Sequence, residues 1–190
     1  FVQPLITFMA SIAITNAIST EAGRQLKALG GSDATRIEEF VMLGGAGFQV
    51  AIMFGSVTLG KIVDSTKRYK GMVCLLMVAT VILLAAQAFV QSPILFLTTL
   101  LALGACIGPV QPISAELAVE VAYPQDENAI VAWQQVCGNL FSALTLPLLS
   151  KAAGLRQSAS ESQAVSDYAF YILLEMICVS GLLCFATLRA

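Results

Sequence analysis

The sequence predicts an all-α membrane protein with six transmembrane helices, and three observations support this prediction. Hydrophobic residues make up 57% of the 190 residues and charged residues only 12%, so the chain carries more apolar surface than a water-soluble fold of its size buries. Its mean hydropathy is +0.82. The apolar residues form continuous runs, without the alternating polar residues that are typical of a transmembrane β-barrel.

Six of these runs are long enough to cross a bilayer, and each is expected to form one helix. The connection from Glu21 to Phe40 contains a Gly30-Gly31 pair, which predicts that the first helix continues beyond the membrane and turns at these glycines. Residues 155–167 are rich in Ser and Gln and are expected to form an external loop. The six predicted spans are residues 1–20, 40–60, 71–90, 93–115, 129–150 and 168–188.

Small residues recur in the second and fourth spans at spacings that let helix backbones approach each other. They are Gly47, Ala51 and Gly55 in the second span, and Gly104 and Gly108 in the fourth. Interfaces between transmembrane helices are enriched in such residues because a missing side chain brings the two backbones into contact. We therefore expect the helices that carry them to pack closely.

Two prolines are expected to bend the fourth span near its end. Pro109 and Pro112 lack the backbone N–H that continues a helix, so they interrupt its hydrogen-bond ladder. Bends of this kind are common where a helix lines a cavity. Gln111 lies between the two prolines, which makes it a candidate for the cavity wall.

Composition argues against several classes of function. The formal net charge is -2, which does not fit a nucleic-acid-binding surface. The chain has no histidine, so it lacks the most common general base and a common ligand of zinc and haem. It has no glycine-rich phosphate-binding loop, and its five cysteines all lie inside predicted spans. We therefore expect neither an enzyme nor a bound cofactor or metal.

Polar residues inside the spans are the candidates for substrate binding. An amide side chain costs free energy against lipid, so it is expected to face protein or water. Gln134 belongs to this group, and Gln135 lies one turn before Asn139 on the same side of the fifth span. The alternative for each residue is a hydrogen bond between helices without substrate contact. The candidate substrate-binding residues are Asn16, Gln49, Gln111, Gln135 and Asn139.

The stretch GKIVDSTKRYKG, from Gly60 to Gly71, predicts a tight basic turn between two spans. Glu116 and Glu120 share one helix face and are expected at the same membrane side, where either can pair with Lys67 or Arg68. The alternative is a solvated basic loop that only follows the positive-inside rule. The candidate gating residues are Gly60, Asp64, Arg68, Glu116 and Glu120.

The pattern of Gly60, Asp64 and Arg68 resembles the loop that follows the second and eighth helices in the major facilitator superfamily. The run from Asp64 to Lys70 and the run from Glu116 to Glu127 are similar to the feline leukaemia virus subgroup C receptor-related carriers, solute carrier family 49. The resemblance implies a twelve-helix alternating-access carrier. This chain would supply helices seven to twelve as one six-helix bundle over residues 1–190.

The chain begins inside an apolar run without an initiator Met, so we expect a longer protein in which another six-helix half precedes it. The expected partners are that half, the lipid bilayer and a small-molecule substrate, and the expected location is the plasma membrane. The family is associated with choline and ethanolamine uptake and, in older proposals, with haem export. The match puts Asn16 and Asn139 where the choline carriers have a tyrosine and a glutamine.

Two alternatives stay open at this point. Trp133, the only tryptophan, can serve as an interfacial anchor or supply an aromatic ring for a cation. The protein as a whole can be a carrier, or a receptor-like sensor that keeps the carrier architecture without net transport.

Overall fold

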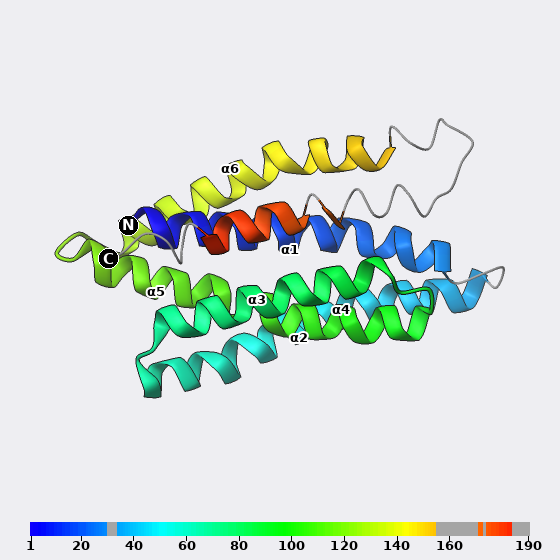
Figure 1. The fold of residues 1–190 in the computed structure, drawn as a ribbon, viewed down its shortest axis with the longest axis horizontal. Coiled ribbons are helices and arrows are strands. Elements are labelled where there is room, and N and C mark those ends of the chain that lie inside the picture. Colours follow the sequence, from blue (N-terminus) through cyan, green and yellow to red (C-terminus); the bar gives the residue numbers. More distant parts are fainter. Residues whose placement is uncertain (30–33, 155–170, 173, 184–190) are drawn as a thin grey trace.

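A computed structural model describes residues 1–29, 34–154, 171–172 and 174–183, and these residues form helices joined by short turns, with no strand among them. Six helices, labelled α1 to α6 in Figure 1, make up most of the described chain, and a further short apolar helix covers Leu174–Leu183. The predicted all-α class is therefore confirmed. The labelled helices are α1 (Val2–Leu29), α2 (Ala34–Thr66), α3 (Tyr69–Ala88), α4 (Pro93–Ile107), α5 (Val110–Ala122) and α6 (Glu127–Gly154).

Five segments of the described chain are long and apolar enough to cross a membrane: Val2–Lys27, Glu38–Thr66, Tyr69–Ala88, Pro93–Ala122 and Glu127–Leu149. This result supports an integral membrane protein. The sixth predicted span, residues 168–188, lies partly outside the described residues, and its described part includes the ten-residue helix Leu174–Leu183. A full sixth crossing stays a prediction. The expected turn at Gly30-Gly31 and the expected loop at 155–167 also lie outside the described residues.

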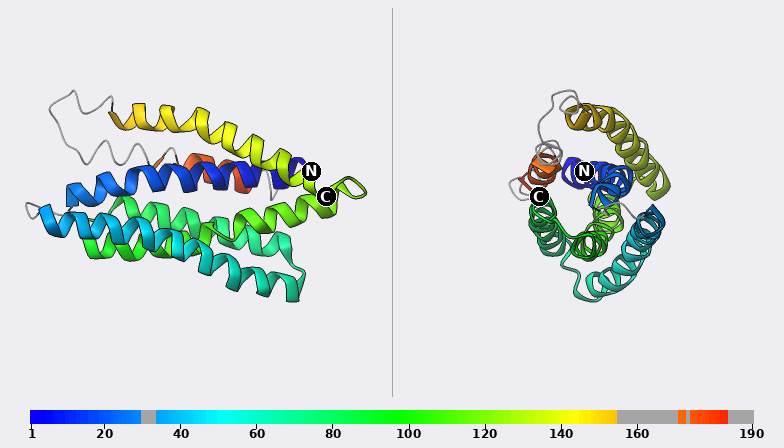
Figure 2. Two further views of the ribbon diagram at one scale, coloured as in Figure 1. Left: turned by 180° about the vertical axis from the view of Figure 1, so that it is seen from behind. Right: turned by 90° about the vertical axis from the view of Figure 1, so that its right-hand side faces the viewer.

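The helices surround α1 and α5 (Figure 2). In the end-on view, α3 and the helix Leu174–Leu183 lie on one side of this pair, and α2 and α6 lie on the other. α1 packs against α6, α5 and α2, whereas α2 packs mainly along α4. The start of α1, the α2–α3 turn and the α5–α6 turn lie at one end of the bundle, at the left in Figure 1. We call this end the turn end.

Burial is unequal among the helices. In the first span 56% of the residues in its most apolar stretch are buried, whereas the shares for the spans of α2 and α6 are only 17% and 22%. Phe54 on α2 and Trp133 on α6 are among the exposed large side chains. Apolar surface of this extent needs lipid or another helical bundle to cover it.

Close contact between α2 and α4 depends on glycine, as the spacing predicts. A Cβ atom added at Gly55 would clash with the carbonyl oxygen of Ala105, and one at Gly108 would lie 2.7 Å from the carbonyl oxygen of Ile52. A Cβ at Gly104 would lie 2.9 Å from the carbonyl oxygen of Phe48. The missing side chains therefore allow the two backbones to touch.

The fourth span is interrupted where the prolines predict it, because α4 ends at Ile107 and α5 begins at Val110. Gly108 and Pro109, between the two helices, keep helical dihedral angles. The Gly108 N–H still bonds to the Gly104 carbonyl at 3.0 Å, and the Pro109 carbonyl accepts the Ile113 N–H at 3.2 Å. Pro112 lies in the first turn of α5, where backbone N–H groups have no acceptor within the helix, so its missing N–H causes no second break.

Candidate functional site: a polar cluster on α1, α5 and α6

The middle of α1 is tied to α6 by a hydrogen bond between side chains. Asn16 Nδ2 donates to Ser142 Oγ at 2.9 Å, and Ser142 is buried. The two helices come close because Gly138 lies against Ile12, where an added Cβ would approach Ile12 Cδ1 to 2.6 Å. One turn further along each helix, this contact brings Asn16 to Ser142.

A second hydrogen bond links α1 to α5, just after the break in the fourth span. Gln111 Nε2 donates to Thr15 Oγ1 at 3.5 Å, a long bond. Thr15 precedes Asn16 in the chain, and both residues, like Gln111, are half-buried. Thr15, Asn16, Gln111 and Ser142 thus bring three spanning helices together through uncharged polar groups. We call these four residues the amide–hydroxyl cluster.

The other three candidate binding residues do not join this cluster by hydrogen bonds. Gln49 on α2 and both Gln135 and Asn139 on α6 are exposed. Their side chains form no hydrogen bond with any described residue, so whether they contact a substrate stays a prediction. The structure links only Asn16 and Gln111 of the predicted set, each through a hydroxyl group.

Sequence reasoning missed both hydroxyl residues, Thr15 and Ser142. Serine and threonine in a helix usually bond to a carbonyl of the preceding turn, as Thr145 does to the Phe141 carbonyl at 2.9 Å. Their presence in a span is therefore a weak signal. Only the position of Ser142, seven residues after Gln135 and therefore on the same face of α6, offered a hint.

Gln134 on α6 is fully buried, and its amide nitrogen and oxygen have no hydrogen-bond partner among the described residues. It lies one turn before Gly138, on the face of α6 that packs against α1. An unpaired buried amide costs free energy, so Gln134 destabilises this conformation.

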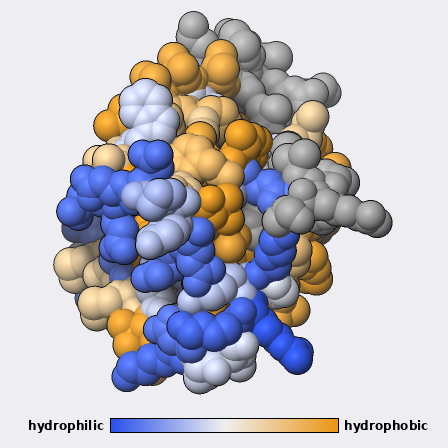
Figure 3. All heavy atoms as spheres, turned by 90° about the vertical axis from the view of Figure 1, so that its left-hand side faces the viewer, coloured by the Kyte–Doolittle hydropathy of each residue, from blue (hydrophilic) through white to orange (hydrophobic). Residues whose placement is uncertain are grey.

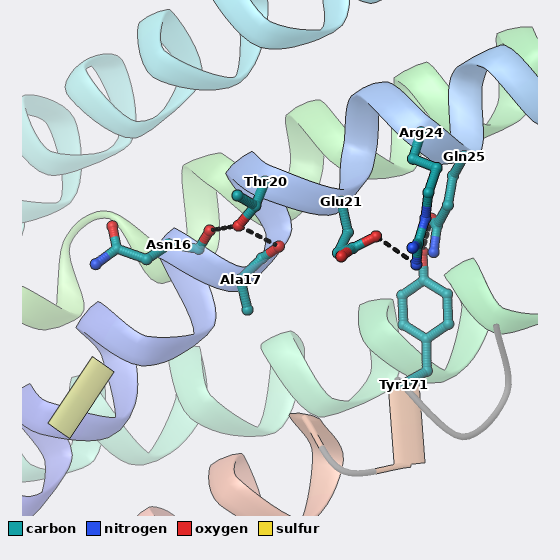
Figure 4. Close-up of polar contacts among 7 residues, drawn as sticks. All are labelled: Asn16, Ala17, Thr20, Glu21, Arg24, Gln25 and Tyr171. Carbon is teal, nitrogen blue, oxygen red and sulfur yellow. Dashed lines mark hydrogen bonds and ion pairs between the residues drawn. The ribbon is translucent and has the colours of Figure 1, made fainter. Parts of the chain in front are cut away.

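Further along α1 is a second polar group, which Figure 4 shows on a different side of the helix from the Asn16 side chain. Glu21 Oε2 lies 2.6 Å from Arg24 Nη2, and the Tyr171 hydroxyl donates to Gln25 Oε1. Glu21 and Gln25 are buried. The charges of this group are thus paired with each other and stay apart from the amide–hydroxyl cluster.

At the turn end, Figure 3 shows hydrophilic side chains gathered over the surface, with apolar patches between them. Lys67 connects α2 to α3 in the left-handed region, at a φ of 54°. Its Nζ donates to Tyr69 Oη at 3.4 Å. This hydrogen bond and the tyrosine charge raise the pKa of Lys67, with smaller contributions from Asp64 and Glu120. The basic turn and the end of α5 therefore face a common region.

The candidate gating residues lie at this end but do not pair in this conformation. Asp64, Arg68, Glu116 and Glu120 are all exposed, and none forms an ion pair with a described residue. The expected pair of Arg68 with Glu116 or Glu120 is therefore not formed in this conformation, and Glu120 makes only the smallest of the contributions that raise the pKa of Lys67. No neighbouring segment of the described chain approaches Gly60, because a Cβ there would meet nothing within 4 Å.

Glu116 lines a groove between α5 and α6. The groove has a volume of about 530 Å³ and also contains Glu127, Asn128, Val119 and Val131.

Among the described residues, no group of three or more His, Cys, Asp or Glu side chains is placed to hold a metal ion. The chain matches no protein-family model and no curated protein. Membership of the carrier family therefore stays a prediction from the residues.

Proposed function

We propose that this chain is one half of an alternating-access transporter that moves a small polar organic solute across a membrane. The amide–hydroxyl cluster is the observation that carries the proposal. It lies within three spanning segments, where polar side chains are costly and commonly mark a substrate path. Transporter substrate sites typically lie near the bilayer midplane between helices, and Asn16 lies near the middle of the apolar segment Val2–Lys27, which supports this role.

A second six-helix bundle would cover the exposed faces of α2 and α6 and complete the cavity. The low burial of these two helices supports such a partner. The resemblance to the major facilitator superfamily predicts the same arrangement, with this chain as helices seven to twelve. Gln49, Gln135 and Asn139 would then face the solute or the second bundle.

The turn end would carry the cytoplasmic lock. Asp64 and Arg68 would pair with Glu116 or Glu120, or with the second bundle, in the conformation closed on that side. Their exposure supports this role because each side chain is accessible to a new partner. Gly60 would let the second bundle approach, since open space surrounds it in this chain. The family resemblance points to the plasma membrane and to choline-like, ethanolamine-like or haem-related solutes.

Transport is tested with the intact protein in proteoliposomes and labelled choline, ethanolamine, amino acids and haem. We expect saturable flux of at least one solute and its loss in Asn16→Leu. The matched control is Thr98→Val on α4, whose exposed hydroxyl bonds only to its own helix, at 2.9 Å from the Leu95 carbonyl. Binding without flux would indicate a receptor-like sensor instead. If the protein neither binds nor moves any of these solutes, the transporter proposal is rejected for them.

A further inference from the structure

We propose that the amide–hydroxyl cluster is a subsite for a neutral hydroxyl or amide group, so that the solute is a polyhydroxy or amide-bearing molecule. This inference rests on the proposed function, because it names the chemistry recognised on α1, α5 and α6. It differs from the quaternary ammonium chemistry that the family resemblance implies.

Each amide of the cluster is bonded through one of its two ends. Asn16 Nδ2 reaches Ser142 Oγ and Gln111 Nε2 reaches Thr15 Oγ1. The oxygens Asn16 Oδ1 and Gln111 Oε1 have no hydrogen-bond partner among the residues described. Both side chains are half-buried, so each presents a free amide end at an accessible surface.

The partner of each amide is a hydroxyl group, which makes the free end adaptable. A hydroxyl can donate or accept, so Ser142 can bond to either end of the Asn16 amide after the amide turns by 180°. The same exchange is open to Gln111 with Thr15. The cluster can therefore offer a solute either an N–H donor or a carbonyl acceptor at each of two positions.

Neutral hydroxyl and amide groups suit such a site because they also donate and accept. A carboxylate only accepts, an ammonium only donates, and a quaternary ammonium does neither. Charge complementarity is also missing at these hydrogen-bonded groups. Glu21 on α1 is paired with Arg24 at 2.6 Å. Glu116, five residues after Gln111, lies about 140° around α5 from it and lines the groove toward α6. A charged group would lose its hydration at the cluster without gaining an opposite charge.

The test measures thermal stabilisation of the intact protein by three probes of similar size: xylitol, which is neutral, choline and gluconate. Polyols stabilise most proteins by exclusion from their surface, in a way that does not saturate. Thr98→Val measures this background, because its change is of the same kind and lies on the exposed face of α4. Asn16→Leu and Gln111→Leu each remove one amide of the cluster. Gln111→Leu leaves only the half-buried Thr15 unpaired, which makes it the safer variant for folding.

We expect xylitol to add a saturable stabilisation in the wild-type protein and in Thr98→Val. In Gln111→Leu its apparent affinity should fall about tenfold, the equivalent of one lost hydrogen bond. A saturable choline or gluconate effect that disappears in Gln111→Leu, or a xylitol effect equal in all variants, would overturn the subsite. Saturable binding of xylitol without flux would reject the transporter but leave the subsite in place.

Discussion

At the scale of single residues, the polar contacts of α1 carry the account. Asn16 and Gln111 could be predicted from the sequence because an amide in an apolar span needs a partner. Their partners could not, because hydroxyl residues in helices usually bond to their own backbone. The pairing also depends on the register between α1 and α6, which follows from the contact of Gly138 with Ile12 and is not readable from either helix alone.

The Asn16–Ser142 bond is expected to stabilise the fold. Asn16→Ala leaves the buried Ser142 hydroxyl without its partner, which should cost about 1–3 kcal/mol. Ser142→Ala in the same background should add little further loss, since both partners are then gone. Thermal unfolding of the two single variants and the double variant measures the coupling. Additive losses would show that the two side chains do not interact.

Gln134 gives a prediction of the opposite sign. Gln134→Leu removes an unpaired buried amide and keeps a similar volume, so stability should rise by about 1 kcal/mol or more. The melting temperature in detergent checks this outcome. A clear decrease would mean that the amide is satisfied, by a contact outside the described residues or by the second bundle.

At the scale of helices, the sequence predicted the role of some glycines and not of others. The glycine spacing in α2 and α4 was readable because small residues at helical intervals serve few other purposes in a span. Gly60 differs from these glycines, because no neighbouring segment among the described residues approaches it. A glycine near the end of a helix can serve several roles, and the sequence does not separate them.

These two glycines form a matched pair of variants. Gly55→Ala places a methyl group against the Ala105 carbonyl and should destabilise the protein by about 1–3 kcal/mol through overpacking. Gly60→Ala should not lower the melting temperature, because no atom lies within 4 Å of the new methyl group. Equal losses in both variants would contradict the packing of α2 on α4. Normal stability with reduced flux in Gly60→Ala would favour contact with a second bundle.

The α2–α3 turn makes a prediction about protonation. The pKa of Lys67 is raised mainly by the hydrogen bond to Tyr69, so the charged form contributes stability at neutral pH. That contribution is lost only as pH rises through the raised pKa of Lys67, which lies above the ordinary pKa of a lysine. Stability should therefore show no step from this group between about pH 6 and 9.

Side-chain NMR of Lys67 measures this effect directly. Tyr69→Phe should lower the pKa of Lys67 more than Glu120→Gln does, because Glu120 is the weakest of the groups that raise it. The reverse order would show that the lysine pairs with the end of α5 instead of the tyrosine.

At the scale of the whole molecule, composition was sufficient to predict helices in lipid, and the structure supports five spans of adequate length. The uneven burial of the spans could not be predicted, because apolar residues that face lipid and those that face protein have the same composition. The sequence also does not show which charges at the turn end are paired in this conformation, since exposed charges change partners between conformations. The exposed faces of α2 and α6 and the unpaired charges at the turn end both fit a bundle that works against a second one.

The central claim is that the amide–hydroxyl cluster lies on a path open in turn to each side of the membrane. Asn16→Cys, in the intact protein with Cys74, Cys106, Cys137, Cys178 and Cys184 replaced, tests this claim with a thiol reagent that does not cross lipid. We predict that Cys at position 16 is labelled from both sides when the transporter moves freely, and from one side only when it is held in one conformation. Thr98→Cys, on the exposed face of α4, is the control. Absence of labelling from either side, or labelling from one side only in every condition, would contradict the claim.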